Sequence, residues 1–153
     1  MKNQRKTVFE ITPQTHVRAT QGDRVFFRIP RENLRPAGLK RLLRLERYNE
    51  YKLALGGMAK QKRFTPPHQG GWLIFYIPVS KSWKKYKKAE MHLKLHQNKP
   101  DWDNLAKAFF DSLLSEDMHI SDVRVTKRWV NKDQGWIEFI SGDQDFASKD
   151  VLL

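Results

Sequence analysis

Apolar and polar residues along the chain form short runs that predict five strands. Two early runs, residues 7–11 and 24–29, are rich in β-branched and aromatic residues, and the turn signal Gln21-Gly22-Asp23 lies between them. The most apolar run, residues 72–77, is bounded by glycines and a proline. Its length and aromatic content predict a buried central strand.

The remaining strands are expected near the end of the chain. Residues 120–130 alternate well enough to form a strand, and residues 136–140 form another. Between them, residues 131–135 have the composition of a turn. This arrangement predicts a hairpin that joins the last two strands.

Two helices are predicted on either side of the central strand. Residues 36–55 carry leucines near helical spacing, and the helix is expected to stop at Gly56-Gly57 because glycine commonly follows a helix end. A shorter helix is expected over residues 83–91, with Ser80 or Ser82 as its cap.

A third helix, at about residues 103–114, has two distinct faces. Its apolar face is formed by residues spaced four apart, Leu105, Phe109 and Leu113. Its polar face repeats the same spacing with Asp103, Lys107 and Asp111. Residues four apart fall within a sector of about 80°, so the polar stripe points away from much of the apolar stripe.

The order of these elements indicates the fold class. Strand, strand, helix, strand, helix, helix, strand, strand describes an α+β protein, with a mixed β-sheet and helices packed on it. We find no internal repeat and no low-complexity linker, so a single domain is expected over residues 1–153. Residues 1–6 and 141–153 are expected to be flexible tails.

The composition indicates which kind of partner the protein binds. The chain has 29 Lys and Arg against 17 Asp and Glu, a formal net charge of +12, and 39% hydrophobic residues. This is a globular protein whose excess of positive charge favours nucleic acid or another polyanion; a solvated basic surface is the alternative. No apolar run approaches the roughly 20 residues that span a bilayer, and there is no cysteine. A cytoplasmic protein without a membrane partner is expected.

Much of the positive charge lies in two segments. The segment after the central strand interleaves Trp83 and Tyr86 with five lysines, Lys81, Lys84, Lys85, Lys87 and Lys88. The lysines could follow a nucleic-acid backbone while the rings stack on bases, or the rings could pack inward under a solvated face. The leucine-rich helix carries a second basic stripe, Lys40, Arg44 and Arg47, which is either solvated or in contact with phosphates.

An acidic cluster interrupts this basic chain. Residues 99–107 read Lys-Pro-Asp-Trp-Asp-Asn-Leu-Ala-Lys and place Asp101 and Asp103 at the mouth of the third helix. Either aspartate could be a helix cap, which the helix dipole favours. A cap needs only one of them, whereas a divalent metal is held by several carboxylate oxygens. Because bare carboxylates repel phosphates, the cluster predicts a metal-dependent nuclease.

A third carboxylate would complete such a site. Asp122 is the best candidate, because it stands near the start of a strand that could return beside the helix entrance, and Asp111 is a further candidate ligand. Glu116 and Asp117 are expected to be solvated. Magnesium would polarise the scissile phosphate, and Lys107 could orient that phosphate or stabilise charge in the transition state.

The motif at residues 99–107, followed by Asp111 and Leu113, resembles the K-P-D-x-D-N-L-x-K-x-x-x-D-x-L signature of RusA-type Holliday-junction resolvases. Asp122 lies nineteen positions after Asp103, where that family places its next catalytic aspartate. The resemblance implies that Asp101, Asp103 and Asp122 bind metal and that Lys107 is essential for cleavage. The family often has two adjacent aspartates at the later site, and here the first of them is Ser121.

The same resemblance implies the reaction and the partners. The expected activity is Mg²⁺-dependent cleavage of four-way DNA junctions at paired, symmetric positions in recombination and repair, with Mn²⁺ as a substitute metal. The expected assembly is a homodimer, encoded by a bacterium, phage or prophage. The residues expected to contact DNA are Lys81, Lys84, Lys85, Lys87, Lys88, Lys99, Arg18 and Arg24.

Two other classes of protein remain open from the sequence. One is a DNA-binding protein that has this fold but does not cut, and the other is a basic RNA-associated protein in which the aspartates only cap a helix. A zinc hydrolase is less well supported, because His92, His96 and His119 lack compact zinc spacing.

Overall fold

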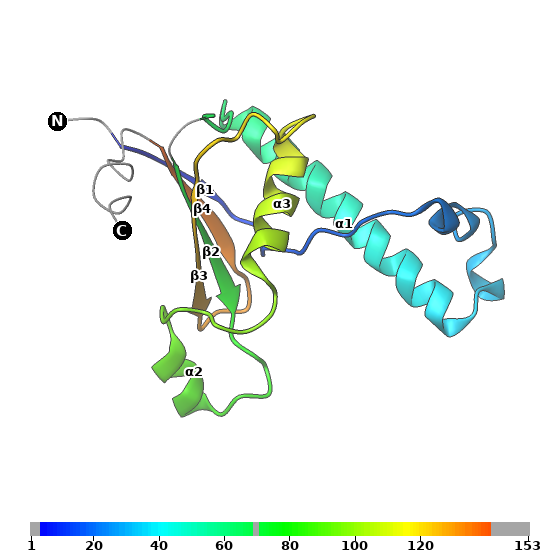
Figure 1. Ribbon diagram of the computed structural model, residues 1–153. Coiled ribbons are helices and arrows are strands. Elements are labelled where there is room, and N and C mark those ends of the chain that lie inside the picture. The colour runs from blue at the N-terminus through cyan, green and yellow to red at the C-terminus, as the bar shows by residue number, and fades with distance from the viewer. Residues whose placement is uncertain (1–3, 69–70, 142–153) are drawn as a thin grey trace, which may run out of the picture.

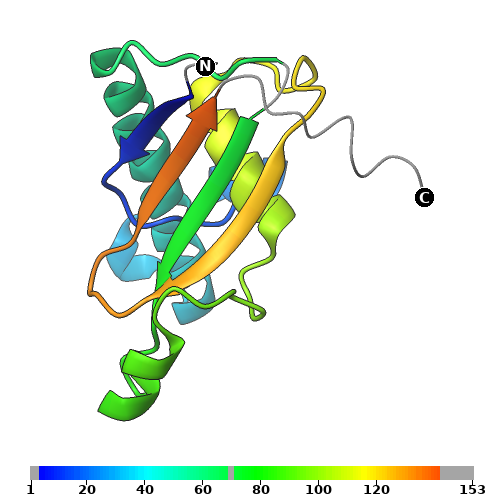
Figure 2. The same cartoon turned by 90° about the vertical axis from the view of Figure 1, so that its left-hand side faces the viewer.

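A four-stranded mixed sheet carries the two main helices on one face (Figures 1 and 2). The computed structural model describes residues 4–68 and 71–141. The strands lie in the order β1 (Arg5–Phe9), β4 (Trp136–Ser141), β2 (Gly71–Pro78) and β3 (Arg124–Val130). Only β2 and β3 are parallel; the other neighbours are antiparallel. The expected α+β class with a mixed sheet is confirmed.

The apolar run at residues 72–77 forms the central strand β2, as predicted. Leu73 and Phe75 are fully buried and belong to the core between sheet and helices. On the other face of the sheet, the Tyr76 ring stacks on Trp136 at 4.5 Å between centroids. Tyr76 and Trp136 also donate hydrogen bonds to the Glu138 carboxylate. The sheet is therefore packed on one face and covered by an aromatic and polar cluster on the other.

The predicted hairpin between the last two strands is wrong. Residues 131–135 do connect β3 to β4, but β2 lies between these two strands and pairs with both. The connection crosses the end of β2 so closely that a Cβ on Gly135 would lie 2.1 Å from the Tyr76 carbonyl oxygen. The most apolar strand, β2, lies in the interior of the sheet, where it pairs with a neighbouring strand on each edge.

Helix α1 (Pro36–Gln61) continues through Gly56-Gly57, where the sequence predicted its end. Gly56 lies against helix α3 (Trp102–Leu113), and a Cβ there would approach the Ser112 carbonyl oxygen to 3.2 Å. The missing side chain lets the two helices pack closely. This glycine therefore serves helix packing and not helix termination.

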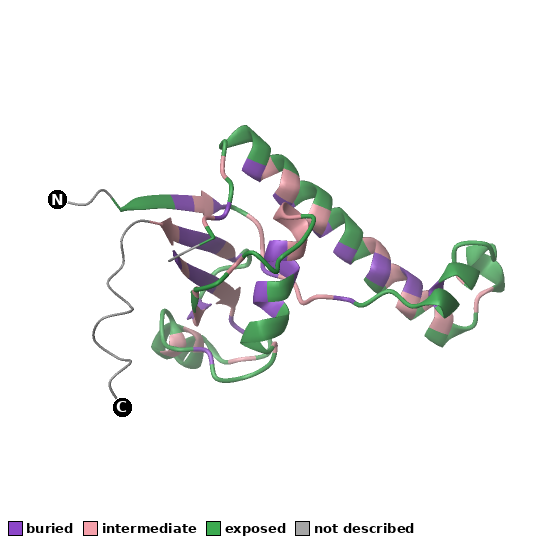
Figure 3. Cartoon of the chain, turned by 45° about the horizontal axis from the view of Figure 1, so that its top comes forward, coloured by how far each residue is buried: buried purple, intermediate pink, exposed green. Residues whose placement is uncertain are grey.

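Helix α3 packs beside α1 on the same face of the sheet and supplies much of the core (Figure 2). Leu105 and Phe109 are fully buried and Leu113 is partly buried, so the predicted apolar face is confirmed. The Phe109 ring lies parallel to Phe139 of β4 at 6.1 Å and meets Phe9 of β1 edge-on at 5.6 Å. Figure 3 shows buried residues on the strands, on α3 and in bands along α1.

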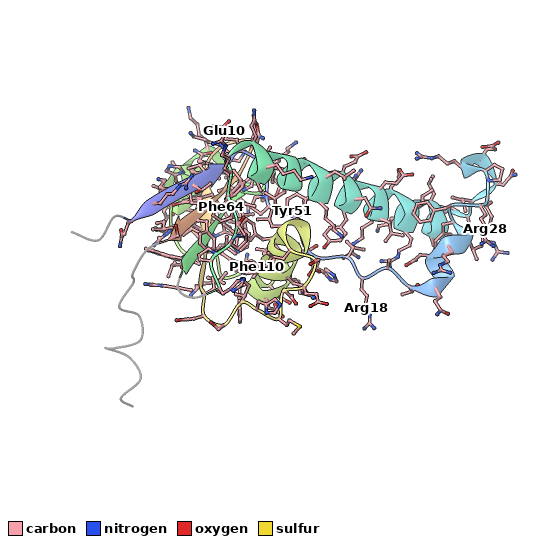
Figure 4. The ribbon with its side chains drawn as sticks, turned by 90° about the horizontal axis from the view of Figure 1, so that it is seen from above. Glu10, Arg18, Arg28, Tyr51, Phe64 and Phe110 are labelled. Carbon is pink, nitrogen blue, oxygen red and sulfur yellow. The ribbon has the colours of Figure 1, made fainter. Side chains whose placement is uncertain are left out.

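The far half of α1 projects away from the sheet and carries residues 18–35 at its end (Figures 1 and 4). We call residues 18–35 the arm. Figure 4 shows the labelled Arg18 and Arg28 on its surface. The strand predicted over residues 24–29 is absent, and the arm instead contains the 3₁₀ turns η1 (Gln21–Val25) and η2 (Arg31–Asn33).

A single carboxylate explains why this segment turns. Asp23 accepts hydrogen bonds from the Thr20 backbone amide at 2.7 Å and from Arg41 Nε at 3.0 Å. The Arg41 guanidinium also donates to the Arg18 carbonyl oxygen. The hydrogen bonds from Arg41 hold the pKa of Asp23 below its usual range. Because these contacts close the backbone around Asp23, the segment does not extend into a strand.

The structure differs from three smaller expectations. Helix α2 (Lys85–Met91) has Lys84 at its N-cap position, and the hydroxyls of Ser80 and Ser82 bond to each other at 2.8 Å and not to the helix. Strand β3 begins at Arg124 and not at residue 120. At the termini, Arg5 pairs with Ser141, so parts of both expected tails belong to the sheet. Residues 1–3 and 142–153 of those tails lie outside the described residues.

None of the helices in the described part of the chain is long and apolar enough to cross a membrane.

Candidate active site

Two adjoining hollows flank the N-terminal end of α3. The first is lined by residues that include His96, Lys99, Asp101, Trp102, Asp103 and Lys127. The second is lined by residues that include His16, Arg44, Lys99, Pro100, Asp101 and Asn104. Lys99 and Asp101 line both hollows. The 99–107 motif therefore forms a concave surface in which two carboxylates lie among three cations.

Asp101 and Asp103 leave their carboxylate oxygens available for a ligand. Asp101 occupies the N-cap position of α3 with an extended backbone, but its side chain makes no capping hydrogen bond. Asp103 stands in the first turn of the helix and is exposed. Within the described residues, neither side chain has a hydrogen bond or an ion pair. Helix capping therefore does not explain the carboxylate of Asp101.

Lys127 of β3 fastens the loop that leads into the motif. Its Nζ donates to the carbonyl oxygens of Asn98 at 2.7 Å and Pro100 at 2.6 Å. Burial lowers the pKa of Lys127, and the Asp101 carboxylate acts in the opposite direction. No pattern in the sequence signals this role, because the strand that carries Lys127 is brought to the loop only by the fold.

Arg44 is a second residue whose position depends on the fold. It belongs to the basic stripe of α1 and lines the second hollow together with Asp101, and Arg47 lies with it around Pro100 in a neighbouring hollow. Of the two interpretations of this stripe, contact with phosphates gains support from that position. The spacing along α1 showed the stripe but not what it faces.

Lys107 lies on the exposed face of α3, one turn beyond Asp103. Its Nζ is 3.6 Å from a carboxylate oxygen of Asp111 and 3.5 Å from one of Asp117. The same Asp111 oxygen is 3.2 Å from Nε2 of His16, whose pKa is lowered chiefly by burial. Asp111 is therefore engaged by two cationic or hydrogen-bonding neighbours. Its role as a further metal ligand stays a prediction.

Asp122 is exposed, precedes β3 and does not line either hollow. Strand β3 starts beside the C-terminal end of α3, because strand and helix run in opposite directions (Figures 1 and 2). The preceding Ser121 donates from both its backbone amide and its hydroxyl to the His68 carbonyl oxygen. Among residues 4–68 and 71–141, no three His, Cys, Asp or Glu side chains are grouped as a metal centre. The role of Asp122 as a ligand stays a prediction.

The lysine-rich segment extends beyond one end of the sheet as α2 and the turn before it. The Trp83 ring packs inward on Trp129 at 4.9 Å, and Lys87 lies 4.1 Å above Trp83. Tyr86, in contrast, is 70% exposed. Four of the five lysines are exposed, and Lys88 is half-buried. Trp83 thus belongs to the packed part of the protein.

The three histidines that we weighed as zinc ligands have other surroundings. His92 Nδ1 accepts a hydrogen bond from the Asn131 backbone amide, and the His119 ring stacks on His68. His96 is buried 3.7 Å from the Trp129 ring, and neither of its ring nitrogens has a hydrogen-bond partner in the described structure. Burial lowers the pKa of His96, which favours the neutral ring.

Fold and site together define a class of protein. Exposed carboxylates at a helix N-terminus, surrounded by Lys99, Lys127 and Arg44, are arranged for chemistry on a phosphodiester that the cations would hold. A family model described as endodeoxyribonuclease RusA matches residues 29–137 of the 153-residue chain. The chain belongs to the RusA family, and the resemblance seen in the 99–107 motif is confirmed.

Membership of this family identifies the chain as an endodeoxyribonuclease of the Holliday-junction resolvase class. The family acts on branched DNA and is found in bacteria and phages. The matched range includes the first hollow, the second hollow except Thr15 and His16, and the four residues proposed from the motif, Asp101, Asp103, Lys107 and Asp122. No curated protein matches the chain.

Proposed function

We propose that this protein resolves four-way DNA junctions by paired, symmetric cuts that depend on Mg²⁺. Asp101, Asp103 and Asp122 are the proposed metal ligands, and Lys107 is the proposed phosphate-facing cation. The observation that carries the proposal is that Asp101 stands at the N-cap of α3 without capping it. Its carboxylate and that of Asp103 are turned to a hollow lined by cations.

The residues around this hollow fit a hard divalent cation. Mg²⁺ prefers oxygen ligands and is commonly bound by one or two carboxylates plus phosphate oxygens, which Asp101, Asp103 and a DNA strand could supply. When bound, it polarises the scissile phosphoryl group and assists formation of the nucleophile. Lys99, Lys127 and Arg44 would hold the DNA phosphates next to the carboxylates, which otherwise repel them.

Two cuts at symmetric positions require two equivalent active sites. A homodimer with a two-fold axis places one site on each of two strands of a junction. The proposed dimer explains paired cutting without a second active site in the chain. The exposed lysines Lys81, Lys84, Lys85 and Lys87, together with Arg18 and Arg24, would contact the arms of the junction.

A cleavage assay on a synthetic four-way junction tests the proposal. We expect the purified protein with Mg²⁺ to cut the junction at paired, symmetric positions and to leave a linear duplex of the same sequence largely intact. Sequencing gels of each labelled strand give the positions. A junction that is bound tightly yet stays uncut with Mg²⁺ and with Mn²⁺ would support the non-catalytic DNA-binding alternative.

Lys127→Met is expected to weaken the site without removing a proposed ligand. The variant loses both hydrogen bonds to the loop before Asp101. Because residues that orient metal ligands typically contribute 10–100-fold to metal affinity or activity, we expect the Mg²⁺ concentration for half-maximal cleavage to rise about 10–100-fold. Metal titrations of junction cleavage measure this.

Arg128→Met is the matched control for Lys127. Arg128 is the next residue on β3 and also donates to a carbonyl oxygen, that of Leu93 at 2.9 Å, but it does not line the hollow. We expect its Mg²⁺ requirement to match that of the native protein. Equal shifts in both variants would mean that any loss of positive charge on β3 produces the effect.

A further inference from the structure

Trp102 lies between the two proposed metal ligands and has an exposed ring. It is the first residue of α3, and it lines the same hollow as Asp101 and Asp103. Its side chain is 59% exposed. A large aromatic side chain at this exposure contributes little to the core, so the fold does not account for it.

The contacts of the other tryptophan rings differ from those of Trp102. All five tryptophans lie in the described part of the chain, and the rings of four of them have a stacking or cation–π partner. Trp72 lies under Arg124, Trp83 packs on Trp129, His96 lies against Trp129, and Trp136 stacks on Tyr76. No stacking, cation–π or hydrogen-bond partner from the described residues accompanies Trp102. Its faces are therefore available to a molecule outside the chain.

The surroundings of Trp102 restrict the partner that could cover it. Asp103 and Asp101 flank it in sequence, and Lys99 and Lys127 line the same hollow. An apolar protein surface would have to desolvate these charges when it covers the ring. A nucleotide presents a flat base beside a charged phosphate, so it can stack on the ring while its phosphate stays among the cations.

We propose that Trp102 stacks on a DNA base at the branch point, next to the phosphate that is cut. Bases within a continuous duplex are stacked on both sides and have no face to offer. Bases at the crossover of an open junction have lost one stacking neighbour. Trp102 therefore selects branched DNA over linear duplex, and this inference rests on the proposed function of the hollow.

The test uses junction binding in metal-free buffer, in which the DNA is not cut. One branch-point base is replaced by 2-aminopurine, whose fluorescence reports stacking. Because base–aromatic stacking is substantial, we expect Trp102→Ala to weaken junction binding about 10–100-fold and to change duplex binding by less than about twofold. The fluorescence change that accompanies native binding should be lost in Trp102→Ala and largely retained in Trp102→Phe.

Phe27→Ala is the matched control, since Phe27 is 58% exposed but lies in the arm. We expect it to keep the native preference for junctions. An unchanged junction-to-duplex ratio in Trp102→Ala, with the native fluorescence change, would overturn the proposal. So would a change of oligomeric state in sedimentation by Trp102→Ala and Trp102→Phe, because the ring would then cover a second copy.

Failure of this inference can be separated from failure of the proposed function. If the native protein cuts junctions with Mg²⁺ and Trp102→Ala keeps the preference for branched DNA, only the role of Trp102 is lost. If the native protein binds junctions through Trp102 and never cuts them, the stacking stands and the proposed cleavage is lost. Circular dichroism of each variant confirms that the fold is intact.

Discussion

Asp103→Asn is expected to lower Mg²⁺-supported cleavage of a four-way junction by about 1,000-fold or more while junction binding stays within a few-fold of native. Asparagine keeps the size of the side chain but removes a charge that would hold the metal. A bound metal stabilises transition-state charge by several kcal/mol, and about 4 kcal/mol corresponds to about 1,000-fold in rate. Single-turnover cleavage and gel-shift titrations measure the two quantities.

Glu116→Gln is the control for Asp103→Asn. Glu116 is an exposed acid just beyond α3 and makes no hydrogen bond or ion pair within the described structure, so its substitution removes a charge without touching the hollow. We expect cleavage close to native. If Asp103→Asn instead lowers the melting temperature and loses binding and cleavage together, Asp103 stabilises the start of α3 and the metal assignment fails.

The sequence predicted those elements whose signal is local. The length and aromatic content of the apolar run at residues 72–77 predicted a buried strand, and the four-residue spacing of Leu105, Phe109 and Leu113 indicated a helix with one buried face. The motif itself also carried geometric information. Because Asp101 and Asp103 flank a helix start, their proximity follows from the backbone alone.

The sequence did not predict features that depend on contacts between distant residues. Asp23 turns the arm because it meets Arg41, eighteen positions away, and nothing in residues 24–29 shows this contact. The sequence pattern shows which residues form strands. It does not show the order of the strands in the sheet, and β2 lies between β3 and β4 because of how the strands pair. Lys127 reaches the first hollow from β3 and Arg44 reaches the second from α1, and only the fold brings these elements to the 99–107 motif.

Phe109→Ala is expected to destabilise the whole domain by about 3–5 kcal/mol, because truncation of a buried phenylalanine removes apolar burial and leaves a cavity. Phe109 is fully buried, and its ring contacts Phe9, Phe139 and Phe110. A domain is stable by only about 5–15 kcal/mol, so the loss is a large fraction of the total. Urea unfolding should show a lower midpoint with an unchanged slope.

Phe109→Leu is the companion variant, because it keeps an apolar side chain at the centre of the same cluster. We expect a smaller loss of stability than for Phe109→Ala and nearly native cleavage per folded molecule. In both variants, activity should fall only as far as the folded fraction falls, whereas Asp103→Asn loses activity while folded. Equal stability of Phe109→Ala and the native protein would mean that α3, and with it the hollow, is held to the sheet by other contacts.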